Sequence, residues 1–269
     1  MYPYIEILGR SYPTYGIFAA IGLVLSGLVV YFLVKNKGIF FEDIAMTGLY
    51  LAIGLFIGSH IMYGITNADK IVVLFQHISE YTFLDFIKTL FGVYMGGMVF
   101  YGGLIGGLVA LVLADKFSKK KYFKGDIMFD PVAVVIPLFH TFGRIGCFFG
   151  GCCYGIECKV GFTFHGNTLY PEVNDVNRLP VQLIEAACNL ILFLILLALY
   201  KKQKFPKRLL IVYFFMYPVV RFTLEFFRGD EIRGFLFGLS TSQIISILLF
   251  TFALVFTITD KLKKNKQVQ

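Results

Sequence analysis

Residues 140–155 read HTFGRIGCFFGGCCYG. The stretch begins inside an apolar run that is long enough to be a membrane helix, and Arg144 lies within that run. Glycines and cysteines follow, and these residues are poor continuations of a helix. In a membrane segment, a charge and a backbone break occur together mainly where the chain lines a cavity. We therefore expect the functional site to be built around this stretch.

The rest of the chain is strongly apolar. Of the 269 residues 57% are hydrophobic, and the mean hydropathy is +0.74, whereas soluble domains are closer to half apolar. The net charge of +8 does not indicate nucleic-acid binding, because the basic residues fall in short gaps between apolar runs. The composition predicts an all-α, polytopic membrane protein that forms a single integral-membrane domain over residues 1–269.

A spanning helix needs about 20 mostly apolar residues, and the sequence offers seven such runs. They lie near residues 13–34, 44–65, 93–114, 127–147, 180–200, 209–227 and 239–259. Of the 25 basic residues, sixteen follow the first, third, fifth and seventh runs, and seven lie on the opposite side. Because Lys and Arg are enriched in cytoplasmic loops, the N-terminus is predicted outside and the C-terminus in the cytoplasm.

Two arginines lie inside predicted helices, in the halves that this topology places outward. Arg144 and Arg221 each need a counter-charge, a water-filled cavity or a bound anion. Glu225 follows Arg221 by one helical turn, so an ion pair between them is expected. No acidic residue lies close to Arg144 in the sequence. Gln182 and Glu185 share one face at the start of the fifth run, which indicates a polar vestibule there.

His140 and the cysteines near it allow other interpretations. Imidazole and thiolate are ligands that zinc and copper prefer, but the sequence has no Cys-x-x-Cys pair. We therefore assign no metal site and expect no cofactor. A disulfide or a thiol relay on an oxidising outer face is a further alternative.

Taken together, these motifs resemble the prolipoprotein diacylglyceryl transferase family over most of the chain. The matching residues are Tyr15-Gly16, residues 102–106 (GGLIG), residues 143–146 (GRIG), Pro180, Gln182, Glu185, Arg221, residues 225–228 (EFFR) and residues 242–244 (SQI). Such enzymes move a diacylglyceryl group from phosphatidylglycerol to the cysteine thiol of a prolipoprotein signal peptide, and glycerol phosphate leaves. The resemblance implies a multi-pass transferase of the bacterial plasma membrane, acting among membrane lipids at the outer face.

The resemblance also implies roles for individual residues. Those expected to bind substrate are Arg144, Tyr15, Gly102, Gly103, Gly155, Tyr217, Gln182 and Glu225, and those expected to act in catalysis are Tyr101, His140 and Arg221. The arginines would grip the lipid phosphate and stabilise the charge that develops on it. The acceptor thiol must lose its proton to become a nucleophile.

This chain departs from the family pattern at several positions. A histidine normally precedes Gly-Gly-Leu, where this chain has Tyr101, and an arginine often occupies the position of His60. Cys147, Gly150 and Cys152 stand where the family has two asparagines and a glutamate. Tyrosine has a reference pKa near 10 and is a weak base at neutral pH, so His140 is expected to substitute, with His60 as a second candidate.

Two alternative functions follow from these departures. One is a membrane thiol–disulfide or metal protein that uses Cys147, Cys152 and Cys153. The other is a non-catalytic, lipid-binding relative.

Overall fold

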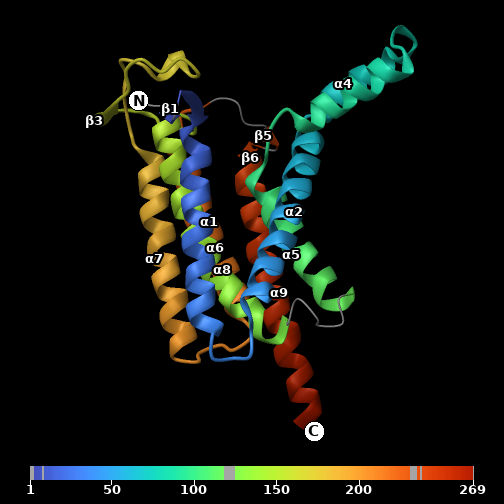
Figure 1. The fold of residues 1–269 in the computed structure, drawn as a ribbon, viewed down its shortest axis with the longest axis vertical. Coiled ribbons are helices and arrows are strands. Elements are labelled where there is room, and N and C mark those ends of the chain that lie inside the picture. Colours follow the sequence, from blue (N-terminus) through green and yellow to red (C-terminus); the bar gives the residue numbers. More distant parts are fainter. Residues whose placement is uncertain (1–2, 8, 118–124, 231–234, 237, 269) are drawn as a thin grey trace. The chain divides into compact units, whose positions relative to one another are not determined.

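The computed structural model describes residues 3–7, 9–117, 125–230, 235–236 and 238–268. The chain is mostly helical and divides into two compact units (Figure 1). The first unit consists of residues 1–34 and 129–269, and the second of residues 35–128. Each unit is described by itself, and the single domain expected over residues 1–269 stays a prediction.

Apolar helices pack side by side in the first unit (Figure 1). They are α1 (Thr14–Val34), α6 (Gly125–Gly150, in this unit from Phe129), α7 (Val181–Lys201), α8 (Leu209–Glu225) and α9 (Thr241–Val268). Gly22 lets α1 approach α6 closely, because a Cβ there would lie 2.9 Å from Phe142 Cβ. The Thr141 hydroxyl of α6 donates to the Ala186 carbonyl of α7 at 3.4 Å. α8 packs against both α7 and α9.

Short antiparallel strand pairs accompany these helices. They are β1 (Tyr4–Ile7) with β2 (Arg10–Pro13), β3 (Glu157–Thr163) with β4 (Asn177–Arg178), and β5 (Phe235–Leu236) with β6 (Leu239–Ser240). A short 3₁₀ turn, η2 (Pro171–Val173), lies between β3 and β4. The β3–β4 pair connects the end of α6 to the start of α7, so it closes the loop that follows the stretch at residues 140–155.

The second unit is organised by contact between glycines. It contains α2 (Phe41–Thr66), α3 (Ala68–Gln76), η1 (Ile78–Glu80), α4 (Phe83–Met95) and α5 (Phe100–Phe117). A Cβ on Gly58 of α2 would overlap the carbonyl oxygen of Gly102 in α5, and a Cβ on Gly102 would overlap that of Gly58. Gly54 and Gly106 face each other in the same way one turn along. Small residues at these positions let two backbones meet directly.

Six helices in the described part of the chain are long and apolar enough to cross a membrane, so the protein is a multi-span membrane protein. They are α1, α2, α5, α6, α7 and α9. The run at 209–227 forms α8, which has 17 residues and ends at Glu225. At about 1.5 Å per residue, this helix is shorter than the hydrocarbon core of a typical bilayer.

Two predicted helix boundaries are wrong. The run at 93–114 does not form one helix, because α4 ends at Met95 and α5 begins at Phe100, with glycines at 96 and 97 between them. The helix predicted over 127–147 continues to Gly150, and the chain turns at Gly151, where φ is +78°. The basic segment at 118–124, which contributed to the predicted topology, lies outside the described residues. The orientation in the membrane stays a prediction.

Candidate active site

One face of α6 carries three functional side chains. His140, Arg144 and Cys147 follow each other at intervals of four and three residues, which places them on one stripe of a helix. All three are buried. Regular helical spacing alone therefore aligns an imidazole, a guanidinium and a thiol along one line that points into the first unit.

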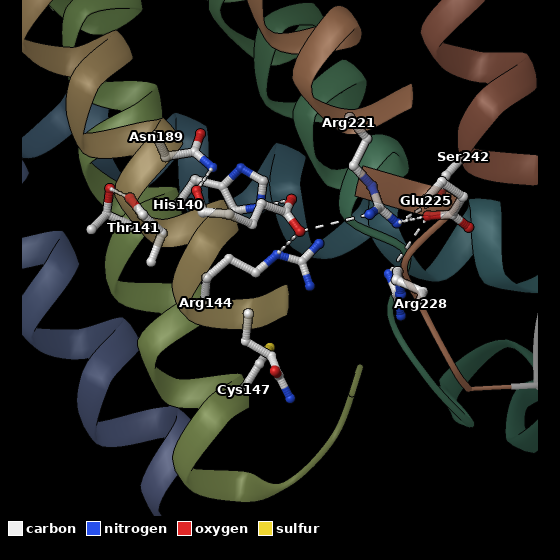
Figure 2. Close-up of polar contacts among 12 residues, drawn as sticks. His140, Thr141, Arg144, Cys147, Asn189, Arg221, Glu225, Arg228 and Ser242 are labelled. Atoms are coloured by element: carbon white, nitrogen blue, oxygen red, sulfur yellow. Dashed lines mark hydrogen bonds and ion pairs between the residues drawn. The ribbon is translucent and has the colours of Figure 1, made fainter. Parts of the chain in front are cut away.

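Glu185, on the first turns of α7, connects this stripe to α8 (Figure 2). Its Oε2 atom lies 3.0 Å from Arg144 Nε and 3.6 Å from Arg221 Nη1. Its Oε1 atom lies 3.7 Å from His140 Nε2 and accepts a hydrogen bond of 3.4 Å from the Tyr217 hydroxyl. The carboxylate is only 1% exposed. A buried carboxylate shared by two guanidiniums offsets charges that would otherwise be strongly destabilising.

The network continues from Arg221 to the end of α8. Arg221 Nη2 lies 2.7 Å from Glu225 Oε2 and donates to the Ser242 hydroxyl at 2.9 Å. Arg228 Nη1 lies 4.0 Å from the same Glu225 oxygen. Arg228 also grips Asp230 with two hydrogen bonds, from Nη2 at 2.6 Å and from Nε at 3.0 Å. The guanidiniums and carboxylates therefore alternate along one continuous network.

The arginines of this network come from different elements and converge (Figure 2). Arg144 meets Glu185 through Nε, and Figure 2 shows its two terminal amino groups directed away from that carboxylate. Arg221 lies on α8, and Arg228 follows that helix. Planar guanidiniums fixed in this way suit bidentate recognition of phosphate. The arrangement can bind an anionic head group and stabilise negative charge that develops on it.

The turn after α6 folds two cysteines back towards the helix. Gly151 and Cys153 have positive φ angles of 78° and 58°. The backbone N–H of Cys152 donates to the Cys147 carbonyl at 3.2 Å, and the side-chain amide of Gln182 donates to the Cys152 carbonyl at 2.8 Å. As a result, the sulfur atoms of Cys147, Cys152 and Cys153 all lie within 4.8 Å of one another. All five cysteines of the chain are free thiols.

The same turn meets the arginine network from the other side. Gly229 donates its backbone N–H to the Tyr154 carbonyl at 3.0 Å. Hydrogen bonds with its neighbouring thiols, together with the charges of Arg228 and Arg144, hold the pKa of the Cys153 thiol well below its usual range, although burial alone raises it. Burial acts to lower the pKa of Arg228, but Cys153 and Asp230 outweigh burial and raise it. The cysteine turn and the arginines therefore share one electrostatic environment.

The structure brings together most of the residues that the sequence predicted for the site. His140, Arg144, Gln182, Tyr217, Arg221 and Glu225 all belong to the arrangement described above, and the expected Arg221–Glu225 ion pair is confirmed. Tyr15 lies against Gly146, where a Cβ would come within 3.1 Å of Tyr15 Cα. Gly155 forms a β-bridge with Arg228, and a Cβ on it would overlap the Leu179 carbonyl oxygen.

Four predicted residues belong to the second unit. Tyr101 is buried near the start of α5. Gly102 and Gly103 face α2, where Gly103 would place a Cβ 3.1 Å from Leu55 Cγ. His60 is buried in α2 and its Nδ1 lies 3.1 Å from the Tyr94 carbonyl oxygen. The contacts described for the two glycines and His60 lie within the second unit, and the substrate and proton-transfer roles of all four residues stay predictions.

Two features of the site went beyond the sequence predictions. The carboxylate partner of Arg144 lies on a different helix, so searching near Arg144 in the sequence did not find it; the available signal was a glutamate inside an apolar run. The cysteine spacing is not typical of a metal site, yet the tight turn at residues 151–153 brings the three sulfur atoms together.

Comparison with known proteins places these observations in context. The sequence model described as prolipoprotein diacylglyceryl transferase matches residues 4–259. A phosphatidylglycerol–prolipoprotein diacylglyceryl transferase of Clostridium tetani is 29% identical over 97% of this chain and 98% of its own length. A protein of the same name from Campylobacter jejuni is 31% identical over 96% of this chain and 93% of its own length.

Proposed function

Because the chain belongs to the prolipoprotein diacylglyceryl transferase family, we propose that it transfers a diacylglyceryl group from phosphatidylglycerol to the cysteine thiol of prolipoprotein signal peptides. The observation that carries this proposal is the buried arrangement of Arg144 and Arg221 around Glu185. The proposal includes a location in the bacterial plasma membrane, with seven spans including α8, the N-terminus outside and the C-terminus in the cytoplasm. It treats residues 1–269 as one membrane domain.

The reaction requires a fixed group of cations beside the lipid phosphate. The acceptor sulfur attacks the glycerol carbon that carries the phosphate, so a C–S bond forms and the C–O bond to phosphate breaks. Glycerol phosphate leaves with the electron pair of that bond, and negative charge grows on its oxygens. Arg144 and Arg221 are held by Glu185 before the substrate arrives, so they stabilise this charge without having to reorganise.

The acceptor thiol must give up its proton, and we assign that proton to His140. The imidazole lies on the same face of α6 as Arg144, and its Nε2 is 3.7 Å from Glu185 Oε1. A carboxylate beside an imidazole stabilises the imidazolium that forms when the proton is taken up. Tyr101 is the second group proposed to take part in proton transfer.

The remaining predicted residues are proposed to shape the substrate site. Gln182 holds the cysteine turn, and Tyr217 and Glu225 hold Glu185 and Arg221. Further contacts to the lipid or the peptide are proposed for Tyr15, Gly102, Gly103 and Gly155.

Transfer from phosphatidylglycerol to a peptide with a signal-peptide cysteine, measured with purified protein, tests the proposal. Arg144→Ala is expected to lower the rate about 10²–10³-fold, because it removes a group that stabilises transition-state charge. Arg208→Ala is the matched control, since Arg208 pairs with Asp260 away from the site. A wild-type protein that retains phosphatidylglycerol but does not turn it over would instead indicate a lipid-binding relative. Equal rates for wild type and Arg144→Ala would exclude the assigned role.

A further inference from the structure

The three-thiol cluster formed by Cys147, Cys152 and Cys153 has the dimensions of a metal site. Thiolates bound to one zinc ion at about 2.3 Å in a tetrahedron lie roughly 3.8 Å apart. The three sulfur atoms lie within 4.8 Å of one another, so small side-chain rotations bring them to that distance. Thiolates are the ligands that select zinc and monovalent copper.

The backbone around the cluster is held from several sides. Gln182 of α7 binds the Cys152 carbonyl at 2.8 Å, and Asn167 binds the Gly150 carbonyl at 3.2 Å. Cys153 has a φ of 58°, a conformation that side chains rarely adopt and that persists where surrounding structure enforces it. The turn therefore holds Cys153 in the cluster despite a backbone conformation that would favour glycine.

The charge around the cluster fits a metal–thiolate complex. Three thiolates and one divalent ion carry a net charge of about −1, and a buried anion needs nearby cations. Arg144 and Arg228 both interact electrostatically with Cys153. Cys147 is buried, whereas Cys152 and Cys153 are partly exposed. Among the residues that the structure describes, the group contains no fourth histidine, cysteine or carboxylate.

We propose that Cys147, Cys152 and Cys153 bind a thiophilic d¹⁰ metal ion, Zn²⁺ or Cu⁺, and that its open position takes the acceptor thiol of the substrate. Three protein ligands with one open position is the arrangement of catalytic zinc sites. The second half of this proposal rests on the proposed transferase function. When the acceptor thiol binds the ion, its proton passes to His140 and its sulfur remains as a metal-bound thiolate beside Arg144. The metal undergoes no change of oxidation state, and the sulfur then attacks the lipid as described above.

Metal content tests the site without relying on activity. Full-length protein purified under reducing conditions is analysed for zinc and copper, then stripped with a chelator and reloaded separately with Zn²⁺, Cu⁺ or the spectroscopic probe Co²⁺. The expected result is a single retained ion and thiolate-to-cobalt absorption in the near ultraviolet. Retention of Zn²⁺ alone or Cu⁺ alone identifies which ion the site prefers. No retention of any of these ions by the wild type would overturn the proposal, as would an intramolecular disulfide among the three cysteines in the reduced preparation.

Cys153→Gly is the most informative variant. Glycine adopts a φ of 58° readily, so this change keeps the turn while it removes a ligand. Metal binding is expected to be lost in Cys153→Gly and Cys147→Ser, and retained in the control Cys188→Ser, whose sulfur lies outside the cluster. Unchanged metal affinity in Cys153→Gly would overturn the site.

Adding the acceptor peptide separates the two proposals. A peptide with the signal-peptide cysteine is expected to shift the spectrum of the Co²⁺ protein, and the same peptide with serine is not. If the cobalt spectrum ignores the cysteine peptide, the acceptor role of the ion is wrong. If metal binds as expected but no lipid is transferred, the proposed function fails and the metal site stands. If metal-free protein and Cys153→Gly transfer lipid at the wild-type rate, the proposed function stands and the catalytic role of the metal fails.

Discussion

The two units of this protein hold their helices together in opposite ways. In the second unit, α2 and α5 meet backbone to backbone through Gly54, Gly58, Gly102 and Gly106. In the first unit, α6, α7 and α8 are joined by the buried charges of Arg144, Glu185 and Arg221. Apolar surroundings give helices little hydrophobic reason to associate, so each unit needs a specific device. The glycine contact tolerates no added atom, whereas the charge network tolerates no lost charge.

The largest effect is expected from removing the shared carboxylate. Glu185→Gln leaves Arg144 and Arg221 buried without their common counter-charge, and breaking a buried ion pair in this way costs about 3–5 kcal/mol. Transfer activity should be lost as well, since both arginines lose their fixed positions. The unfolding free energy in mixed micelles and the transfer rate measure the two effects.

Glu157→Gln is the matched control for that change. Glu157 lies 3.6 Å from Arg178 and its side chain is 69% exposed, and exposed pairs contribute at most about 1 kcal/mol. Equal losses of stability in the two variants would show that the buried network does not hold the first unit together.

A smaller effect is expected from adding one methyl group to the second unit. Gly58→Ala places a Cβ against the Gly102 carbonyl oxygen, which is backbone and cannot rotate away. Overpacking of this kind costs about 1–3 kcal/mol. The comparison is Gly48→Ala on the same helix, where a Cβ meets nothing within 4 Å and where alanine favours the helix. A loss of stability in Gly48→Ala as large as in Gly58→Ala would contradict the close-contact explanation.

The sequence predicted much of this architecture because the relevant signals are local. Apolar runs located the helices, and the spacing of Arg221 and Glu225 predicted their ion pair, since one helical turn fixes which side chains meet. Ser240 at the start of the last apolar run is confirmed as a cap, because its hydroxyl accepts the N–H of Gln243 at 3.2 Å. Gln243 returns a bond to the Ser240 N–H at 2.9 Å, which completes a capping box.

The features that the sequence did not predict depend on contacts between distant segments. The hydropathy of residues 93–114 does not show that glycines at 96 and 97 divide it between two helices. The partner of Arg144 lies on α7, and periodicity carries no information about which helices become neighbours. The cysteine cluster depends on a positive φ at Cys153, which is uncommon for a residue other than glycine. Local patterns therefore located the site, and tertiary contacts decided its chemistry.

The smallest expected effects come from two serines at the start of α9, and they sharpen the account of the charge network. Ser242 accepts a hydrogen bond from Arg221 at 2.9 Å, and Ser240 caps the helix backbone. Ser240→Ala should lower the unfolding free energy by about 1 kcal/mol and leave the transfer rate of the folded protein unchanged. Ser242→Ala should lower stability by a similar amount, about 1 kcal/mol, because Arg221 keeps both of its carboxylate partners. If the network positions Arg221 for a phosphate, however, Ser242→Ala should also raise KM for phosphatidylglycerol. A KM that rises equally in both variants would mean that α9 as a whole, rather than the hydrogen bond to Arg221, sets lipid affinity.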